Sequence, residues 1–469
     1  MITVLKRRFF VMLCLSGITA VLLFSCATPP ESAETVPSDE PESEVRPEDP
    51  YQDISSMVQA DDPQAAIAAF EQAELRAPDD PATMVLLANL YVMNGQLDEA
   101  EEILEQVLLQ DPEEADGLYS LAMIRISRGD SRQARELLMQ AVDADPDHAD
   151  AHAALGEILL QNDSLQAAQT AFERSLESDD SSFVARIGLG NVFLRKEEYP
   201  DAVDQFTAAL EIDPAYSFAY ADRARAHIAM QDNESAIQDY TAAIELEPDY
   251  AFHYLDRGRV YVRMNRPEDA LQDYQQALEL RPDDFYIHAQ LADVLFALGR
   301  TQEASDAYVE VLTLRRDYHP AFLPLAVVSF NLENFDRAYR FFHQAFQHDT
   351  QNPGLAIAAA LSLKMDEREQ EAREYLNQQG KDLPRDGAIW AVSRFYQAPD
   401  ADHHVTGALQ DLGRDEDILR TQLEFYIGAQ YLLIGRESSA AAYLSRVEAT
   451  QYTGLPEYRM VHRLLERVQ

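Results

Sequence analysis

Two pairs of histidines come nearest to metal or acid–base chemistry in this sequence of 469 residues. His148 and His152 are four residues apart, and His403 lies next to His404. A zinc site needs three or four converging ligands that are held by further hydrogen bonds. Neither pair reaches that number, so we interpret both as solvated polar residues. The sequence also contains no Gly-rich phosphate loop, and we predict no metal, no cofactor and no catalytic residue.

The use of cysteine points away from thiol chemistry and toward export. Cys14 lies in an apolar run from Phe9 to Phe24 that follows three cationic residues, the layout of a cleaved export signal. The sequence Leu23-Phe24-Ser25-Cys26 resembles a bacterial lipobox, although Phe24 is bulkier than the usual residue. The resemblance implies that residues 1–25 are a lipoprotein signal peptide and that Cys26 is lipidated. The alternatives are an ordinary secretory signal or an uncleaved anchor.

Charge and composition restrict the partners of the chain. Residues 26–50 are rich in Pro and acids, which keeps such a segment extended, and we interpret it as a tether. The whole chain has 38 basic and 82 acidic residues, a formal net charge of −44. Such a chain repels nucleic-acid backbones and anionic membrane surfaces. We therefore expect no nucleic acid as a partner, and contact with a membrane only through the N-terminal lipid.

The rest of the sequence is periodic. We number a repeat frame from Pro81 and restart it at 115, 149, 183, 217, 251, 285, 319, 353 and 421. Frame position 20 is alanine in all ten of these repeats: Ala100, Ala134, Ala168, Ala202, Ala236, Ala270, Ala304, Ala338, Ala372 and Ala440. Position 8 is always Ala or Gly, and position 24 is always a large residue. Apolar residues three and four apart predict two amphipathic helices per repeat, with glycines near position 15 as left-handed helix ends: Gly95, Gly129, Gly299 and Gly435.

This pattern closely resembles the tetratricopeptide repeat, a helix-turn-helix unit whose length equals the spacing of these alanines. The resemblance implies an all-α fold, a right-handed α-solenoid in which each repeat contacts only its neighbours. It divides the chain into a partial N-terminal repeat at 51–80, nine units at 81–386, a degenerate repeat at 387–420, a further unit at 421–454 and a C-terminal capping helix at 455–469.

The resemblance also implies that frame positions 2, 9, 13 and 34 face a concave groove. In the middle repeats we assign to this groove Asn191, Arg195, Tyr216, Phe218, Arg225, Tyr250, Phe252, Arg259, Arg263, Tyr286 and Tyr318. Aromatic rings offer rigid contact area and arginine binds carboxylates, so we predict a groove for a protein or peptide that carries carboxylates. The alternative is that two arginines pair with Asp222 and Asp256, three residues before them, while the rings pack between repeats.

Two other arginines are predicted to be structural. Arg223 and Arg257 occupy frame position 7, where most other units carry leucine. Among residues 81–352, only these two units have aspartate at position 23, namely Asp239 and Asp273. The co-occurrence predicts an ion pair between the two helices of each unit.

Three functions are compatible with these features. The resemblance favours a non-catalytic, membrane-anchored adaptor that binds partner proteins in the bacterial cell envelope. A second possibility is a substrate-binding accessory component of an envelope transporter, and a remote third is an enzyme that uses the region of His403. Because Ala27 follows Cys26, where aspartate commonly marks retention at the inner membrane, we expect the periplasmic face of the outer membrane.

Overall fold

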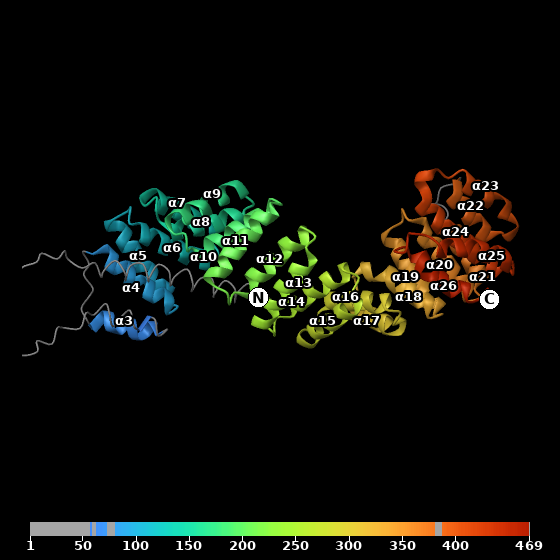
Figure 1. Cartoon of the computed structure of the whole chain (residues 1–469), viewed down its shortest axis with the longest axis horizontal. Coiled ribbons are helices and arrows are strands. Elements are labelled where there is room, and N and C mark those ends of the chain that lie inside the picture. The colour runs from blue at the N-terminus through green and yellow to red at the C-terminus, as the bar shows by residue number, and fades with distance from the viewer. Residues whose placement is uncertain (1–56, 59–61, 73–79, 380–386, 469) are drawn as a thin grey trace, which may run out of the picture. The chain divides into compact units, whose positions relative to one another are not determined.

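The computed structural model describes residues 57–58, 62–72, 80–379 and 387–468 (Figure 1). These residues form twenty-four α-helices and three short 3-10 helices, and no strand occurs among them. The predicted all-α repeat fold is therefore confirmed. The predicted signal peptide at 1–25, Cys26 and the tether at 26–50 lie outside the described residues. Two compact units divide at Asp239 and Tyr240, inside α13 (Asn233–Leu246).

In the first unit, pairs of helices follow the repeat frame. The first helices are α4 (Pro81–Met93), α6 (Ala115–Ser127), α8 (Ala149–Gln161), α10 (Phe183–Arg195) and α12 (Ser217–Ala229). The second helices are α5 (Leu97–Gln110), α7 (Ser131–Ala144), α9 (Leu165–Ser178), α11 (Tyr199–Ile212) and the start of α13, while α3 (Pro63–Gln72) precedes them all. First helices of successive repeats touch, as α4 does with α6 and α8 with α10, and so form one layer.

The second unit continues the same alternation. Its helices up to the 380–386 segment are α14 (Ala251–Arg263), α15 (Pro267–Leu280), α16 (Phe285–Ala297), α17 (Thr301–Leu314), η1 (His319–Ala321), α18 (Phe322–Asn331), α19 (Phe335–His348), α20 (Pro353–Met365) and α21 (Glu369–Gln379). Then come α22 (Gly387–Gln397), η2 (Pro399–Asp402), α23 (His403–Gln410), η3 (Arg414–Glu416), α24 (Asp417–Leu433), α25 (Glu437–Glu448) and α26 (Pro456–Leu465).

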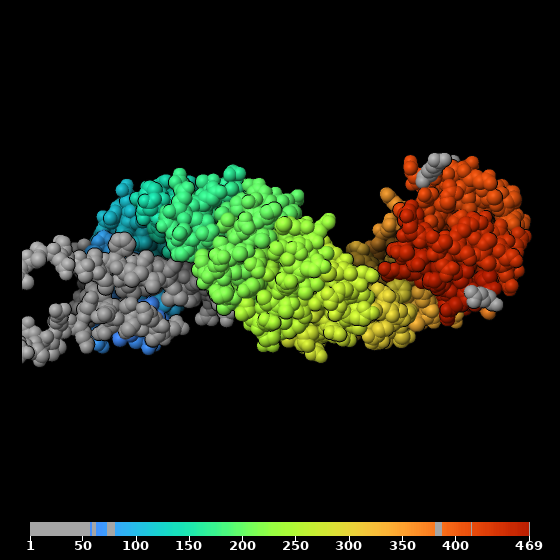
Figure 2. All heavy atoms as spheres, in the orientation of Figure 1, coloured from blue at the N-terminus to red at the C-terminus, as the bar shows by residue number. Residues whose placement is uncertain are grey.

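The C-terminal helices fold back on earlier repeats of the second unit. Helix α24 packs against α20, and α26 packs against α18 as well as α24 and α25. Arg463 and Arg467 of this segment form ion pairs with Glu333 at 2.8 and 3.0 Å, and the Asn331 side-chain amide donates to the Arg459 carbonyl at 2.9 Å. Figure 2 shows these helices, in orange and red, gathered into one mass. The expectation that each repeat contacts only its neighbours is therefore wrong at this end.

Small residues at frame positions 8 and 20 allow the helices to approach closely. All ten alanines at position 20 are fully buried. A Cβ on Gly156 would lie 2.7 Å from the ring of Phe172, the residue at position 24 of the same repeat, and one on Gly258 would lie 2.5 Å from the ring of Tyr274. Because real Cβ atoms do not approach so closely, a larger residue at position 8 would displace the ring that fills the repeat core.

Frame position 15 ends the first helix in a left-handed conformation in ten repeats. The four predicted glycines have φ between 73° and 83°, and the prediction for them is confirmed. Six further repeats place a residue with a side chain in this conformation, at φ of 55° to 65°: Asp163, Glu197, Gln231, Asn265, Glu333 and Glu367. In each turn the backbone N–H of the residue after position 15 donates to a carbonyl of the last helical turn, as the Glu198 N–H does to the Phe193 carbonyl at 2.9 Å. These contacts form the Schellman arrangement, and they hold a conformation that costs a non-glycine residue roughly 1 kcal/mol.

We expect Glu197→Gly to raise the free energy of unfolding by roughly 0.5–1 kcal/mol, because glycine removes the left-handed strain at φ 63°. Chemical denaturation of the two proteins measures the difference. Glu197→Ala is the control, since alanine keeps the strain, and an equal gain from alanine would show that the side chain and not the backbone is responsible.

Candidate functional site

The two histidine pairs are placed in helix caps and helix ends. His148 is the N-cap of α8, where its Nδ1 accepts from the Ala151 N–H at 3.3 Å and its Nε2 lies 3.3 Å from the Asp116 carboxylate. Its side chain is only 10% exposed, so its interpretation as a solvated residue is wrong. Burial lowers the pKa of His148, but Asp116 outweighs burial and the pKa is raised. His403 begins α23, exposed, with Nδ1 3.2 Å from the Asp400 carbonyl. Within the described ranges, no group of three or more potential ligands is placed to hold a metal.

In the first unit, two of the arginines assigned to the groove have partners in the protein itself. Arg195, at the end of α10, donates to the Leu160 carbonyl at 2.6 Å and lies 3.1 Å from the Asp163 carboxylate. Arg225, in α12, pairs with Asp222 at 2.9 Å, and its side chain is 62% exposed. Asn191 is half-buried in α10. The pairing of Arg225 that we considered as the alternative is therefore present.

The second unit repeats this arrangement. Arg259 in α14 lies 3.4 Å from Asp256, three residues before it, and is 55% exposed. Arg263 is exposed at the end of the same helix. Tyr286 is half-buried in the first turn of α16. None of these contacts tests whether the side chains bind a ligand, and that assignment stays a prediction.

The aromatic residues assigned to the groove make ring contacts at the repeat junctions. In the first unit, Tyr216 meets Phe183 edge-on with ring centroids 5.1 Å apart and lies 5.8 Å from Phe218. In the second unit, Tyr318 meets Phe285 at 5.1 Å, and Tyr250 lies 5.5 Å from Phe252 and 4.6 Å from His253. The rings therefore pack between repeats and remain half-buried.

The predicted ion pairs between the helices of a unit are confirmed. Arg223 holds Asp239 with two hydrogen bonds, at 3.0 and 2.6 Å, and Arg257 holds Asp273 in the same way at 2.9 and 2.7 Å. The hydrogen bond to Asp273 raises the pKa of Arg257. The sequence analysis missed a third partner at position 25 of the preceding repeat: Thr207 for the first arginine at 3.1 Å, and Thr241 for the second at 3.0 Å. Each arginine thus joins three helices.

We expect Arg257→Leu to lower the free energy of unfolding by about 2 kcal/mol, because Asp273 is buried and would lose its only bidentate donor among the described residues. The 18% exposure of the arginine to solvent keeps the expected loss at this size. Arg259→Leu, which breaks an exposed pair, should change stability by less than about 0.5 kcal/mol. Thermal denaturation compares the two, and equal losses would contradict the assignment of distinct roles.

Glu157 is a groove candidate that the sequence analysis missed. It lies in α8 at frame position 9, the position of Asn191 and Arg225 in the next two repeats. Burial raises the pKa of Glu157 to about 7. The sequence contained a signal for this residue, because Glu157 is the only glutamate at frame position 9 of the ten repeats. A cationic group on a partner would favour its ionised form.

The pKa of Glu157 predicts a change of stability with pH. Below pH 4.5 the carboxyl is protonated in both folded and unfolded chains, whereas between 4.5 and about 7 only the unfolded chain ionises. The folded state therefore loses stability as the pH rises through this range. Glu157→Gln removes the loss, so we expect the variant to be more stable than the parent by about 1–2 kcal/mol at pH 8 and nearly equal at pH 4. Urea denaturation at both values checks this, and a constant difference would contradict it.

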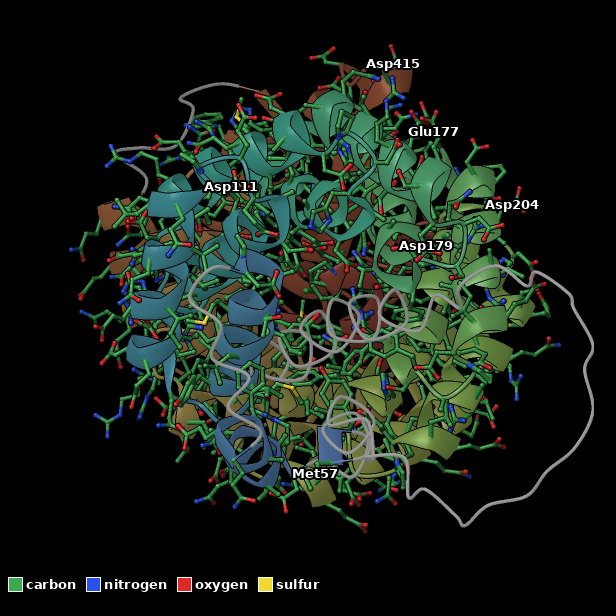
Figure 3. The ribbon with its side chains drawn as sticks, turned by 90° about the vertical axis from the view of Figure 1, so that its left-hand side faces the viewer. Met57, Asp111, Glu177, Asp179, Asp204 and Asp415 are labelled. Carbon is green, nitrogen blue, oxygen red and sulfur yellow. The ribbon has the colours of Figure 1, made fainter. Side chains whose placement is uncertain are left out.

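The surface of the first unit carries much of the negative charge. Figure 3 labels Asp111, Glu177, Asp179 and Asp204, all exposed. Some exposed acids pair along their own helix, as Glu177 does with Arg174 at 2.8 Å. Across the described part of the chain, no helix is both long and apolar enough to span a bilayer.

Family models match most of the repeats. Models described as "Tetratricopeptide repeat" match residues 57–124, 119–183, 161–217, 219–250 and 285–318, and one described as "TPR repeat" matches 258–299. Together these segments span more than half of the 469 residues. A search among curated proteins finds no match.

Three of the solved structures that are similar to this chain are the following. "MamA 41-end from Desulfovibrio magneticus RS-1" is 21% identical, with 36% of this chain and 96% of that chain covered and a TM-score of 0.35. "YrrB: a TPR protein with an unusual peptide-binding site" is 22% identical, with 39% and 95% covered and a TM-score of 0.34. The C-terminal part of a TPR repeat-containing protein from Cytophaga hutchinsonii is 20% identical, with 51% and 98% covered and a TM-score of 0.39.

Proposed function

The chain belongs to the tetratricopeptide repeat proteins, and on this premise we propose that it is a non-catalytic adaptor, lipid-anchored in a bacterial cell envelope, that holds partner proteins. Tetratricopeptide repeats support a scaffold for binding proteins. The lipid anchor, the envelope location and the chemistry of the partner are the further content of the proposal. The observation that carries it is the set of exposed arginines on first helices, in a chain of net charge −44.

The arginine pairs along one helix leave these side chains available to a partner. Arg225 is 62% exposed, whereas Asp222, three residues before it, is 23% exposed and accepts one hydrogen bond from the arginine Nη1. The other N–H groups of the guanidinium can therefore donate to a carboxylate of a partner. The half-buried rings of Tyr216 and Phe218 lie at the start of the same helix, α12, and offer apolar contact along it. This combination suits an extended peptide that carries carboxylates.

The anchor follows from the sequence around Cys26. An acylated Cys26 followed by the acidic tether at 26–50 would hold the repeats at a distance from the bilayer. Since Ala27 follows the cysteine, we propose the periplasmic face of the outer membrane. The alternative function, an accessory component of an envelope transporter, would use the same arginines for a small acidic ligand.

Partner capture tests the proposal. Arg259→Glu removes a donor and places a new carboxylate beside Asp256, so we expect partner binding to weaken by about 2 kcal/mol with little change in melting temperature, because both side chains of this pair are exposed. The matched control is Arg174→Glu, because Arg174 is also exposed and also pairs with an exposed acid three residues along its helix, but lies in a second helix, α9.

Co-purification of the tagged, lipidated protein from membranes supplies the measurement. Equal capture by the two variants would contradict a binding role for Arg259, and a bound small anion in place of a protein would favour the transporter alternative. Cys26→Ser should abolish labelling by radioactive palmitate and move the protein to the soluble envelope fraction, and continued labelling of the variant would contradict the anchor.

A further inference from the structure

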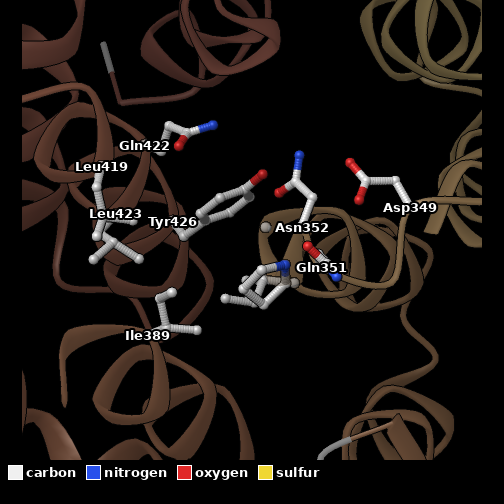
Figure 4. A pocket seen from close by; sticks show the side chains of 11 residues that line it. Asp349, Gln351, Asn352, Ile389, Leu419, Gln422, Leu423 and Tyr426 are labelled. Carbon is white, nitrogen blue, oxygen red and sulfur yellow. The ribbon is translucent and has the colours of Figure 1, made fainter. Parts of the chain in front are cut away.

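The folded-back end of the second unit encloses a pocket of about 390 Å³ (Figure 4). Its described lining comes from the turn between α19 and α20, from the start of α20, from α22 and from α24. Sites that take small ligands or single side chains of a partner have volumes of this order. The pocket uses frame positions that also serve the groove, since Asn352 is at position 34 and Gly354 and Gln422 are at position 2, but it lies outside the middle repeats to which the groove residues were assigned. It depends on the packing of α24 against α20, which the repeat pattern does not predict.

The lining has an apolar side and a polar side. Ile389 and Leu423 form part of the apolar side. Across the pocket, Figure 4 shows Asp349, Gln351 and Asn352, with the Asp349 carboxylate turned toward the side where Asn352 lies. Among the described lining residues, Asp349 is the only charged one. The chemistry therefore fits a ligand with an apolar stem and a cationic end.

The ends of two helices add to this polarity. Helix α19 ends at His348, just before Asp349, and the carbonyl groups at a helix C-terminus favour a cation. Helix α20 begins at Pro353, and its N-terminus favours an anion. Glu457, only 3% exposed, already occupies this position: it accepts from the Tyr426 hydroxyl at 2.7 Å, lies beside Gly354, and has its pKa raised by burial. A cation is thus favoured at the Asp349 end and an uncharged group at the other.

We propose that this pocket binds the side chain of a lysine or arginine of a partner polypeptide, with the aliphatic stem against Ile389 and Leu423 and the cationic group at Asp349. The inference rests on the proposed function only in that the ligand is a polypeptide. The protein would then have a second contact point for a partner, one that favours a cationic side chain, whereas the arginines of the groove favour carboxylates.

Gly354 keeps the floor of the pocket open. A Cβ at this position would lie 3.1 Å from the Asn352 side-chain oxygen and 3.8 Å from the Tyr426 hydroxyl. Gly354→Val therefore fills space between these groups. Asp349→Asn instead removes the charge and keeps the shape, and because Asp349 is exposed this variant should fold as the parent does.

The test uses the full-length protein with labelled Ile and Leu methyl groups and three probes observed by NMR. The probes are acetyl-Ala-Lys-Ala-amide, the same peptide with norleucine in place of lysine, and 1,5-diaminopentane. We expect the lysine peptide to shift the Ile389 and Leu423 methyl signals and to bind about fivefold more tightly than the norleucine peptide, the upper range for an exposed ion pair. Asp349→Asn should abolish this preference, and Gly354→Val should abolish the shifts. Asp283→Asn, which changes an exposed aspartate of the same unit outside the pocket lining, is the control and should do neither.

Several results would overturn the proposal. Equal binding of the lysine and norleucine peptides would show that Asp349 does not bind the cationic group. Absence of shifts of the Ile389 and Leu423 methyl signals in the parent protein would show that the pocket does not bind the peptide. Binding of 1,5-diaminopentane as tight as that of the lysine peptide would overturn the assignment to a polypeptide in favour of a free amine. Partner capture by the parent protein without any shift of the Ile389 and Leu423 methyl signals by the lysine peptide would refute the pocket and leave the adaptor function standing.

Discussion

Close contact between helices at the small frame positions is the constraint on which the rest of the structure depends. With a fully buried alanine at position 20, and alanine or glycine at position 8, the two helices of a repeat approach until the position-24 side chain fills the space between them. Because this contact recurs in every repeat of the frame, the first helices of the described repeats present the same frame positions in the same way. A partner can then be bound by side chains far apart in the sequence.

The arginines of the middle repeats are of two kinds, which differ in how far the close packing of the helices buries their side chains. Arg223 and Arg257 lie where other repeats place leucine, so their charge is partly buried and satisfied by an aspartate and a threonine on neighbouring helices. Arg225 and Arg259, two residues further along the same helices, are exposed, and each donates one hydrogen bond to an aspartate three residues before it. The first kind therefore stabilises the repeat, and the second is available for binding.

Much of the fold could be predicted from the sequence because the repeat itself carries the information. The alanine series defines the frame, and the joint occurrence of arginine and aspartate in two units predicted their ion pairs. Thr207 and Thr241 could also have been found, since threonine occupies position 25 only in the two repeats before those arginines. The packing of the C-terminal helices on earlier repeats could not be predicted. Contacts such as that of Asn331 with Arg459 join residues 128 apart, and they do not alter the periodic pattern of the sequence. The pocket at Asp349 depends on that fold-back and was equally hidden.

The central claim is that the layer of first helices binds a partner protein, and site-specific photo-crosslinking in cells tests it most directly. A photoreactive phenylalanine in place of Asn191, half-buried in α10, should give one discrete adduct with a partner polypeptide. The same group in place of Leu109, 83% exposed near the end of the second helix α5, should give none. Absence of an adduct at position 191, or equal adducts at both positions, would contradict the account.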